Sequence, residues 1–88
     1  MKALVFTSPT CAPCKVYKGT VKTATSLGAN IKVLDVIEDA DMADLYGIRT
    51  VPTTVILSDD DQLVDVLFGV QSVAVLMQNL GLGYELVG

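Results

Sequence analysis

The sequence predicts a single small α/β domain in which strands and helices follow one another in the order β-α-β-α-β-β-α. A length of 88 residues and an apolar share of 51% suit one compact core. A helical stretch separates the first two strand-like runs, and such a connection makes them parallel with a right-handed crossover. The last two strand-like runs are joined by a very short acidic link, so they form an antiparallel hairpin.

The first strand and the first helix lie in the N-terminal third of the chain. Lys2–Ser8 is a short, mostly apolar run with β-branched residues, which is typical of a buried strand. A helix is predicted over Ala12–Leu27, and Gly28 ends it because glycine favours the position after a helix. The expected buried face consists of Val16, Tyr17, Thr20, Val21, Ala24 and Leu27, and the opposite face carries Lys15, Lys18 and Lys22.

A second strand and a short second helix follow. The apolar run Ile31–Val36 predicts the strand. Acidic residues are concentrated at the start of Glu38–Gly47, where negative charge complements the helix dipole, and Gly47 is placed to end the helix.

The C-terminal part contains the hairpin and a third helix. Strands are predicted over Thr53–Ser58 and Gln62–Leu67, around the turn Asp59–Asp61. The third helix is predicted over Gln71–Leu80, with Ser72 as its N-cap. The single domain spans residues 1–88, and its glycine-containing end, residues 80–88, is expected to be a loosely ordered tail.

Charge is distributed unevenly along the chain. Residues 1–32 contain all five lysines and no acid (+5), whereas residues 33–88 contain Arg49 against ten acids (−9). A net charge of −4 argues against a nucleic-acid partner, which favours a broad basic surface. No apolar run approaches the roughly 20 residues of a membrane span, and the N-terminal run is shorter than the roughly 7–15 residues of a signal-peptide core. We therefore expect no membrane partner and a cytoplasmic location.

The only two cysteines, Cys11 and Cys14, lie in the segment TCAPCK. A disulfide between them closes a very small loop and so stabilises the fold little. Structural zinc takes four ligands, whereas this chain has no histidine, so a metal or an iron–sulfur cluster would need a second chain or an external thiol. In a small intracellular domain, cysteine pairs are more often catalytic or metal-binding than structural. A redox couple with no other cofactor and no metal is the favoured interpretation, with a shared metal and inert cysteines as alternatives.

The position of the pair at the start of a helix makes the two thiols unequal. Cys11 faces the unpaired N–H groups of the first turn and the positive end of the helix dipole, both of which stabilise a thiolate. Cys14 lies one turn further in and should be less exposed. This asymmetry suits disulfide exchange, in which Cys11 attacks a substrate disulfide and Cys14 resolves the mixed disulfide. Pro13 is tolerated in the first turn, and Lys15 is close enough to favour the thiolate or to attract an acidic partner.

A proline immediately before a predicted strand is the second functional signal. Pro52 lies in RTVPTT, a place where proline does not disrupt a sheet. A CxxC pair at a strand–helix junction, followed about 40 residues later by IRTVPT before a hairpin, resembles the thioredoxin superfamily. The resemblance covers roughly residues 2–80.

The resemblance implies a thioredoxin fold in minimal form, with a four-stranded mixed sheet in the order 2-1-3-4 and helices on both faces. It also implies that Pro52 follows a cis peptide bond and packs against the cysteines, and that the Val51 backbone pairs with an extended substrate segment. Cys11 is then the nucleophile and Cys14 the resolving thiol. The residues implied at the substrate are Thr10, Thr50, Val51 and Pro52, with Pro13, Lys15 and Gly69 in supporting positions.

The chain departs from the thioredoxin pattern in several places. The usual N-terminal strand and helix are absent, which gives the compact size of a glutaredoxin. Thr10 stands where thioredoxins have tryptophan, and Val5 stands where they bury an aspartate that helps to move protons at the resolving cysteine. The double glycine and the aspartate with which glutaredoxins hold glutathione are missing from Phe68–Ser72.

The expected function is a thiol–disulfide oxidoreductase that works as a monomer. It would reduce protein disulfides through the Cys11–Cys14 couple and donate electrons to cytoplasmic partners. One alternative is a glutathione-dependent reductase of the glutaredoxin type, and another is a dimeric module that shares a metal or an iron–sulfur cluster. The upstream reductant is expected to be a thioredoxin reductase or glutathione.

Overall fold

The sheet has the predicted strand order. The computed structural model describes residues 1–82 and contains strands β1 (Lys2–Thr7), β2 (Ile31–Asp35), β3 (Thr53–Leu57) and β4 (Leu63–Phe68). Their order across the sheet is β2-β1-β3-β4. β1 pairs in parallel with β2, whereas the β1–β3 and β3–β4 pairs are antiparallel. The mixed sheet expected from the sequence is confirmed.

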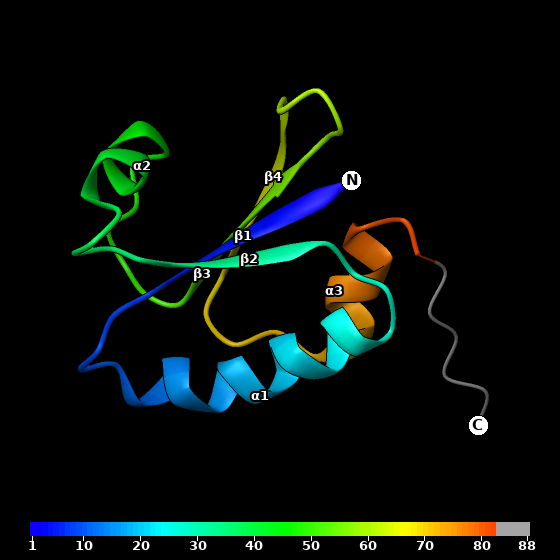
Figure 1. The fold of residues 1–88 in the computed structure, drawn as a ribbon, viewed down its shortest axis with the longest axis horizontal. Coiled ribbons are helices and arrows are strands. Elements are labelled where there is room, and N and C mark those ends of the chain that lie inside the picture. Colours follow the sequence, from blue (N-terminus) through cyan, green and yellow to red (C-terminus); the bar gives the residue numbers. More distant parts are fainter. Residues whose placement is uncertain (83–88) are drawn as a thin grey trace.

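Helices cover both faces of this sheet, but unequally. The helices are α1 (Ala12–Ser26), α2 (Ala40–Leu45) and α3 (Val73–Asn79). α1 and α3 lie together on one face, and α2 lies on the other (Figure 1). Because α2 has only 6 residues, its face is the more thinly covered one.

The core is divided into two clusters by the sheet, and β1 contributes to both. Ala3 and Val5 point towards α1 and α3, whereas Leu4 and Phe6 point towards α2, as the two-residue period of a strand requires. The α1/α3 side also contains Tyr17, Val21, Ala24, Ile56, Leu76, Met77 and Leu80, and the α2 side contains Leu34, Ala43, Val55 and Leu57. Residues 83–88 of the expected tail lie outside the described residues.

The buried face of α1 is narrower than the sequence predicts. Val16 and Leu27 were expected to be buried, but their side chains are 68% and 48% exposed. Val16 lies about 100° around the helix from Tyr17, beyond the stripe that meets the sheet, and Leu27 is the C-cap rather than a helical residue. The stripe that is buried consists of Cys14, Tyr17, Val21 and Ala24.

α2 is shorter than predicted because a turn precedes it. The Asp35 carboxylate accepts a hydrogen bond from the N–H of Ile37 at 2.7 Å, which holds the chain in a turn at the position where the helix was expected to begin. Gly47 follows the helix with φ +63°, in the left-handed region that glycine adopts most readily. No helix within residues 1–82 has both the length and the apolar character needed to cross a membrane.

Candidate functional site

The two cysteines lie at the point where β1 passes into α1. Cys11 is the N-cap of α1, with φ −92° and ψ 108°, and the two cysteines are joined by a disulfide with their Cα atoms 5.2 Å apart. The N–H of Cys14 donates a hydrogen bond to Cys11 Sγ at 3.1 Å, so the sulfur satisfies a donor that the helix leaves unpaired. Pro13 lies in the first turn of α1, where a backbone N–H would have no partner within the helix, so its lack of an N–H removes no helical hydrogen bond.

The two sulfurs have different access to solvent. Cys14 is 0% exposed, whereas Cys11 is half-buried. The predicted difference in exposure between them is therefore present. A partner molecule that approaches this end of the domain meets Cys11 first.

The segment before β3 supplies the second wall of the site. The peptide bond between Val51 and Pro52 is cis, and Pro52 is buried. Cys11 Sγ lies 3.7 Å from the carbonyl oxygen of Val51. A disulfide sulfur carries no hydrogen, so this contact becomes a hydrogen bond only when Cys11 is a thiol that donates to the carbonyl.

Two hydrogen bonds hold this segment in place. Gly69 has φ +78°, and its N–H donates to the carbonyl oxygen of Pro52 at 2.9 Å, which ties the end of β4 to the site. The hydroxyl of Thr53 donates to the carbonyl oxygen of Thr50 at 2.7 Å. Thr50 itself is exposed, so its side chain is accessible at the edge of the site.

The other residues predicted at the site are exposed. Thr10 lies in the turn immediately before Cys11, and Lys15 lies on α1 next to Cys14. Within residues 1–82, the structure shows no hydrogen bond from Thr10 or Lys15 to the cysteine sulfurs and no ion pair of Lys15.

A buried pair of hydroxyl groups lies in the core on the α1 side and was not predicted. Tyr17 Oη and Thr54 Oγ1 are 2.6 Å apart, and both side chains are 0% exposed. Thr54 lies opposite Val5 in the sheet. Burial raises the pKa of Tyr17, and this effect outweighs the opposite effect of its hydrogen bond with Thr54. The sequence predicts Tyr17 only as a packing residue, because helical periodicity does not show which polar atoms meet across the core.

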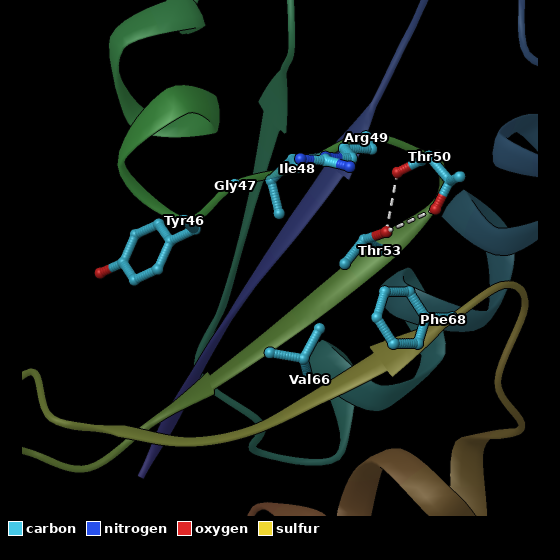
Figure 2. Close-up of a pocket in the computed structure, with 8 residues that line it drawn as sticks. All are labelled: Tyr46, Gly47, Ile48, Arg49, Thr50, Thr53, Val66 and Phe68. Atoms are coloured by element: carbon cyan, nitrogen blue, oxygen red, sulfur yellow. Dashed lines mark hydrogen bonds between the residues drawn. The ribbon is translucent and has the colours of Figure 1, made fainter.

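An apolar pocket adjoins the site on the α2 face and was also missed. It has a volume of about 530 Å³ (Figure 2). Val66 and Phe68 form part of its wall, and their alternation along β4 was the available signal that they share a face. The complete lining is Tyr46, Gly47, Ile48, Arg49, Thr50, Thr53, Val66 and Phe68.

Among the described residues, no group of three or more histidine, cysteine, aspartate or glutamate side chains is arranged to hold a metal ion.

Comparison with known proteins identifies the family. The sequence profile of the thioredoxin family matches residues 2–81. This chain belongs to the thioredoxin family. With the family's fold and a disulfide between Cys11 and Cys14, it is a disulfide oxidoreductase.

Solved thioredoxin structures share the fold over most of their length. A single-site mutant of thioredoxin from Halobacterium salinarum is 30% identical, with 98% of this chain and 76% of that chain covered and a TM-score of 0.83. A thioredoxin from Malassezia sympodialis is 26% identical, with coverage of 88% and 70% and a TM-score of 0.71. Thioredoxin 1 from Thermosipho africanus is 24% identical, with 92% of this chain and 91% of that chain covered and a TM-score of 0.77. None of the curated protein sequences matches this chain.

Proposed function

We propose that this protein reduces disulfide bonds of partner proteins, with Cys11 as the nucleophile and Cys14 as the resolving thiol. The observation that carries the proposal is the disulfide at the start of α1, in which a half-buried Cys11 lies before a fully buried Cys14. The helix start favours negative charge on Cys11, where the reaction needs a thiolate. The Val51 carbonyl beside Cys11 is an acceptor that an extended partner segment can pair with.

The reaction proceeds by two exchanges of sulfur partners. The Cys11 thiolate attacks one sulfur of the partner's disulfide, and the other partner sulfur leaves as a thiolate, which takes up a proton. The Cys14 thiol then loses its proton and attacks Cys11 Sγ, which releases the partner's second thiolate and forms the Cys11–Cys14 disulfide. The partner gains two electrons from this protein, and its two thiolates take up the proton that Cys14 loses and one proton from solvent. An upstream thiol reductant must return the two electrons before the next turnover.

The family match supports thioredoxin reductase as the upstream reductant. Glutathione remains the alternative, and the cytoplasm remains the expected location. The two reductants are separated by following the loss of the Cys11–Cys14 disulfide with each one present alone. Faster reduction by thioredoxin reductase with NADPH supports the proposal, whereas faster reduction by glutathione places the protein with glutaredoxin-type enzymes.

The nucleophile is tested by substitution of each cysteine. We expect Cys11→Ser to lower the catalysed reduction of insulin disulfides to the background rate of the reductant, because no thiolate remains to attack. Cys14→Ser should instead accumulate a mixed disulfide between Cys11 and the partner, which non-reducing electrophoresis and mass spectrometry detect. Unchanged insulin reduction by Cys11→Ser would overturn the proposal.

A further inference from the structure

The pocket beside the redox site exists because α2 leaves the edge of the sheet uncovered. Val66 lies opposite Val55, which packs towards α2, so Val66 and, two residues on, Phe68 face the same side. Within residues 1–82, no helix covers them. The side chain of Phe68 is 72% exposed, an unusual degree for an aromatic residue of a strand.

The walls of the pocket are apolar, and its rim carries one charge. Figure 2 shows Ile48, Val66 and Phe68 around the hollow, with Arg49 along the rim next to Ile48. Arg49 is exposed and is the only charged residue among the described residues that line the pocket. The acidic turn Asp59–Asp61 lies at the other end of β4, so it does not neutralise this rim.

Both walls of the pocket continue into the redox site. On one side, Thr50 precedes Val51, whose carbonyl oxygen lies 3.7 Å from Cys11 Sγ. On the other side, Phe68 precedes Gly69, which donates its N–H to Pro52. A partner segment whose cysteine meets Cys11 therefore passes the mouth of the pocket within a few residues, since extended chain spans about 3.3 Å per residue.

We propose that this pocket receives a large apolar side chain of the disulfide-bearing partner, and that Arg49 pairs with an acidic residue next to that side chain. The inference rests on the proposed function, because it names the class of partner segment that the redox site selects. The occupant has this chemistry because the volume and the apolar walls match an aromatic or aliphatic side chain, and the single charge is positive. The preferred partner segment therefore carries both features close to its cysteine.

The test uses short peptides whose single cysteine forms a mixed disulfide with thionitrobenzoate, so that reduction releases a coloured thiol. A Phe-Glu pair is placed about two to four residues from the cysteine on either side, and matched peptides carry Ser-Glu or Phe-Lys instead. The reference substrate is the mixed disulfide of thionitrobenzoate with mercaptoethanol, which is too small to reach the pocket. The measured quantity is kcat/KM for each peptide divided by kcat/KM for this reference.

We expect the relative kcat/KM of the best Phe-Glu peptide to be about ten times that of its Ser-Glu counterpart. Burial of an aromatic side chain contributes at least that factor. At low salt, the relative kcat/KM of the Phe-Glu peptide should be about five times that of its Phe-Lys counterpart. This preference for Glu over Lys should decrease as salt screens the charges. Phe68→Ser should remove the preference for Phe over Ser, and Arg49→Glu should invert the preference for Glu over Lys. Arg49→Lys should keep the charge preference, and Lys22→Glu, an equal charge change on α1, should alter neither.

A separate binding experiment distinguishes failure of this inference from failure of the proposed function. Peptides with serine in place of cysteine are titrated into the wild-type protein while backbone amide resonances are followed. Shifts centred on Ile48, Val66 and Phe68 support the inference even if reduction is not observed. Equal rates for all peptides with no such shifts would overturn it, although reduction of the reference substrate would leave the proposed function intact. A dimer that Phe68→Ser dissociates would also overturn it, because the occupant would then be a second copy of this chain.

Discussion

The sulfur of Cys11 occupies a place that a serine or aspartate oxygen usually takes at the start of a helix. It accepts the N–H of Cys14 that α1 cannot pair internally. A thiolate accepts such a bond more strongly than a thiol does, so the helix start and the first turn favour the charged form. The backbone at the start of α1 therefore favours the thiolate form of Cys11.

This geometry predicts that Cys11 reacts readily in the reduced protein. In the Cys14→Ser variant, which leaves Cys11 as the only thiol, the rate of alkylation by iodoacetamide is measured against pH. We expect its midpoint below about 8.5, the usual value for a free cysteine. Lys15→Gln, introduced into the same variant, shows how much the charge of the side chain next to the cysteine pair changes this midpoint. A midpoint at or above about 8.5 in the parent variant would contradict the geometric argument.

The buried hydroxyl pair predicts a specific loss of stability in Tyr17→Phe. Removal of the phenol leaves Thr54 Oγ1 buried without its partner, which costs about 1–3 kcal/mol in the free energy of unfolding. Tyr46→Phe is the control, because no hydrogen bond of its hydroxyl is seen among the described residues. The double variant Tyr17→Phe with Thr54→Val should recover part of the loss, since neither partner is then left unpaired. Chemical denaturation measures all four proteins.

The same pair predicts how stability depends on pH. Burial raises the pKa of Tyr17 in the folded protein, so the folded chain keeps a proton that the unfolded chain loses from about pH 10 upward. The contribution of Tyr17 to the free energy of unfolding is therefore complete below about pH 10. It declines as the pH rises through the pKa of Tyr17 in the folded protein. Denaturation curves should show a steeper alkaline loss of stability for the wild type than for Tyr17→Phe. Equal slopes would mean that Tyr17 titrates alike in both states.

At the scale of the elements, two glycines predict opposite effects of the same substitution. Gly19 lies inside α1 with open space where a Cβ would be, so Gly19→Ala should stabilise the protein by about 0.5–1 kcal/mol. Gly69 also has open space, but its φ of +78° is unfavourable for alanine. Gly69→Ala should therefore destabilise by about 1–2 kcal/mol. Thermal denaturation of both variants measures whether each one is more or less stable than the wild type. A lower stability of Gly19→Ala would contradict the assignment of Gly19 to a helix.

The elements also show what the sequence could and could not reveal. β1 and β3 were predicted to within a residue because their apolar runs are continuous and bounded by turn residues. The start of α2 was placed too early because acidic residues favour a helix start and a turn alike, and the Asp35 side chain decides between them. The cysteines and Pro52 were found because local spacing carries their chemistry. The pocket was missed because it depends on how far a six-residue helix reaches across a sheet.

At the scale of the whole molecule, β1 lies in the interior of the sheet with a neighbour on each side. Its antiparallel partner β3 comes from much later in the chain, and Lys2 lies opposite Leu57. Both core clusters also need β3, which supplies Ile56 to one and Val55 to the other. The two faces of the sheet therefore form together with the β1–β3 pair.

This topology predicts that a fragment of residues 1–51 does not fold. It retains β1, α1, β2 and α2, yet lacks the strand that completes both clusters. We expect its circular dichroism to change gradually on heating, with fast amide hydrogen exchange throughout. The full chain measured in the same buffer provides the cooperative reference. A sharp thermal transition in the fragment would show that the first half is an independent unit.

The central place of β1 has a consequence for how the protein is made. β1 leaves the ribosome before the other three described strands, yet one of its edges has no partner until Leu57 has followed it out. At roughly 5–20 residues per second, that interval is on the order of several seconds. During this time one edge of the mostly apolar strand β1 is unpaired, and Cys11 and Cys14 have already been synthesised. Synthesis, rather than the finished fold, is therefore the stage at which this small protein is most open to wrong pairing.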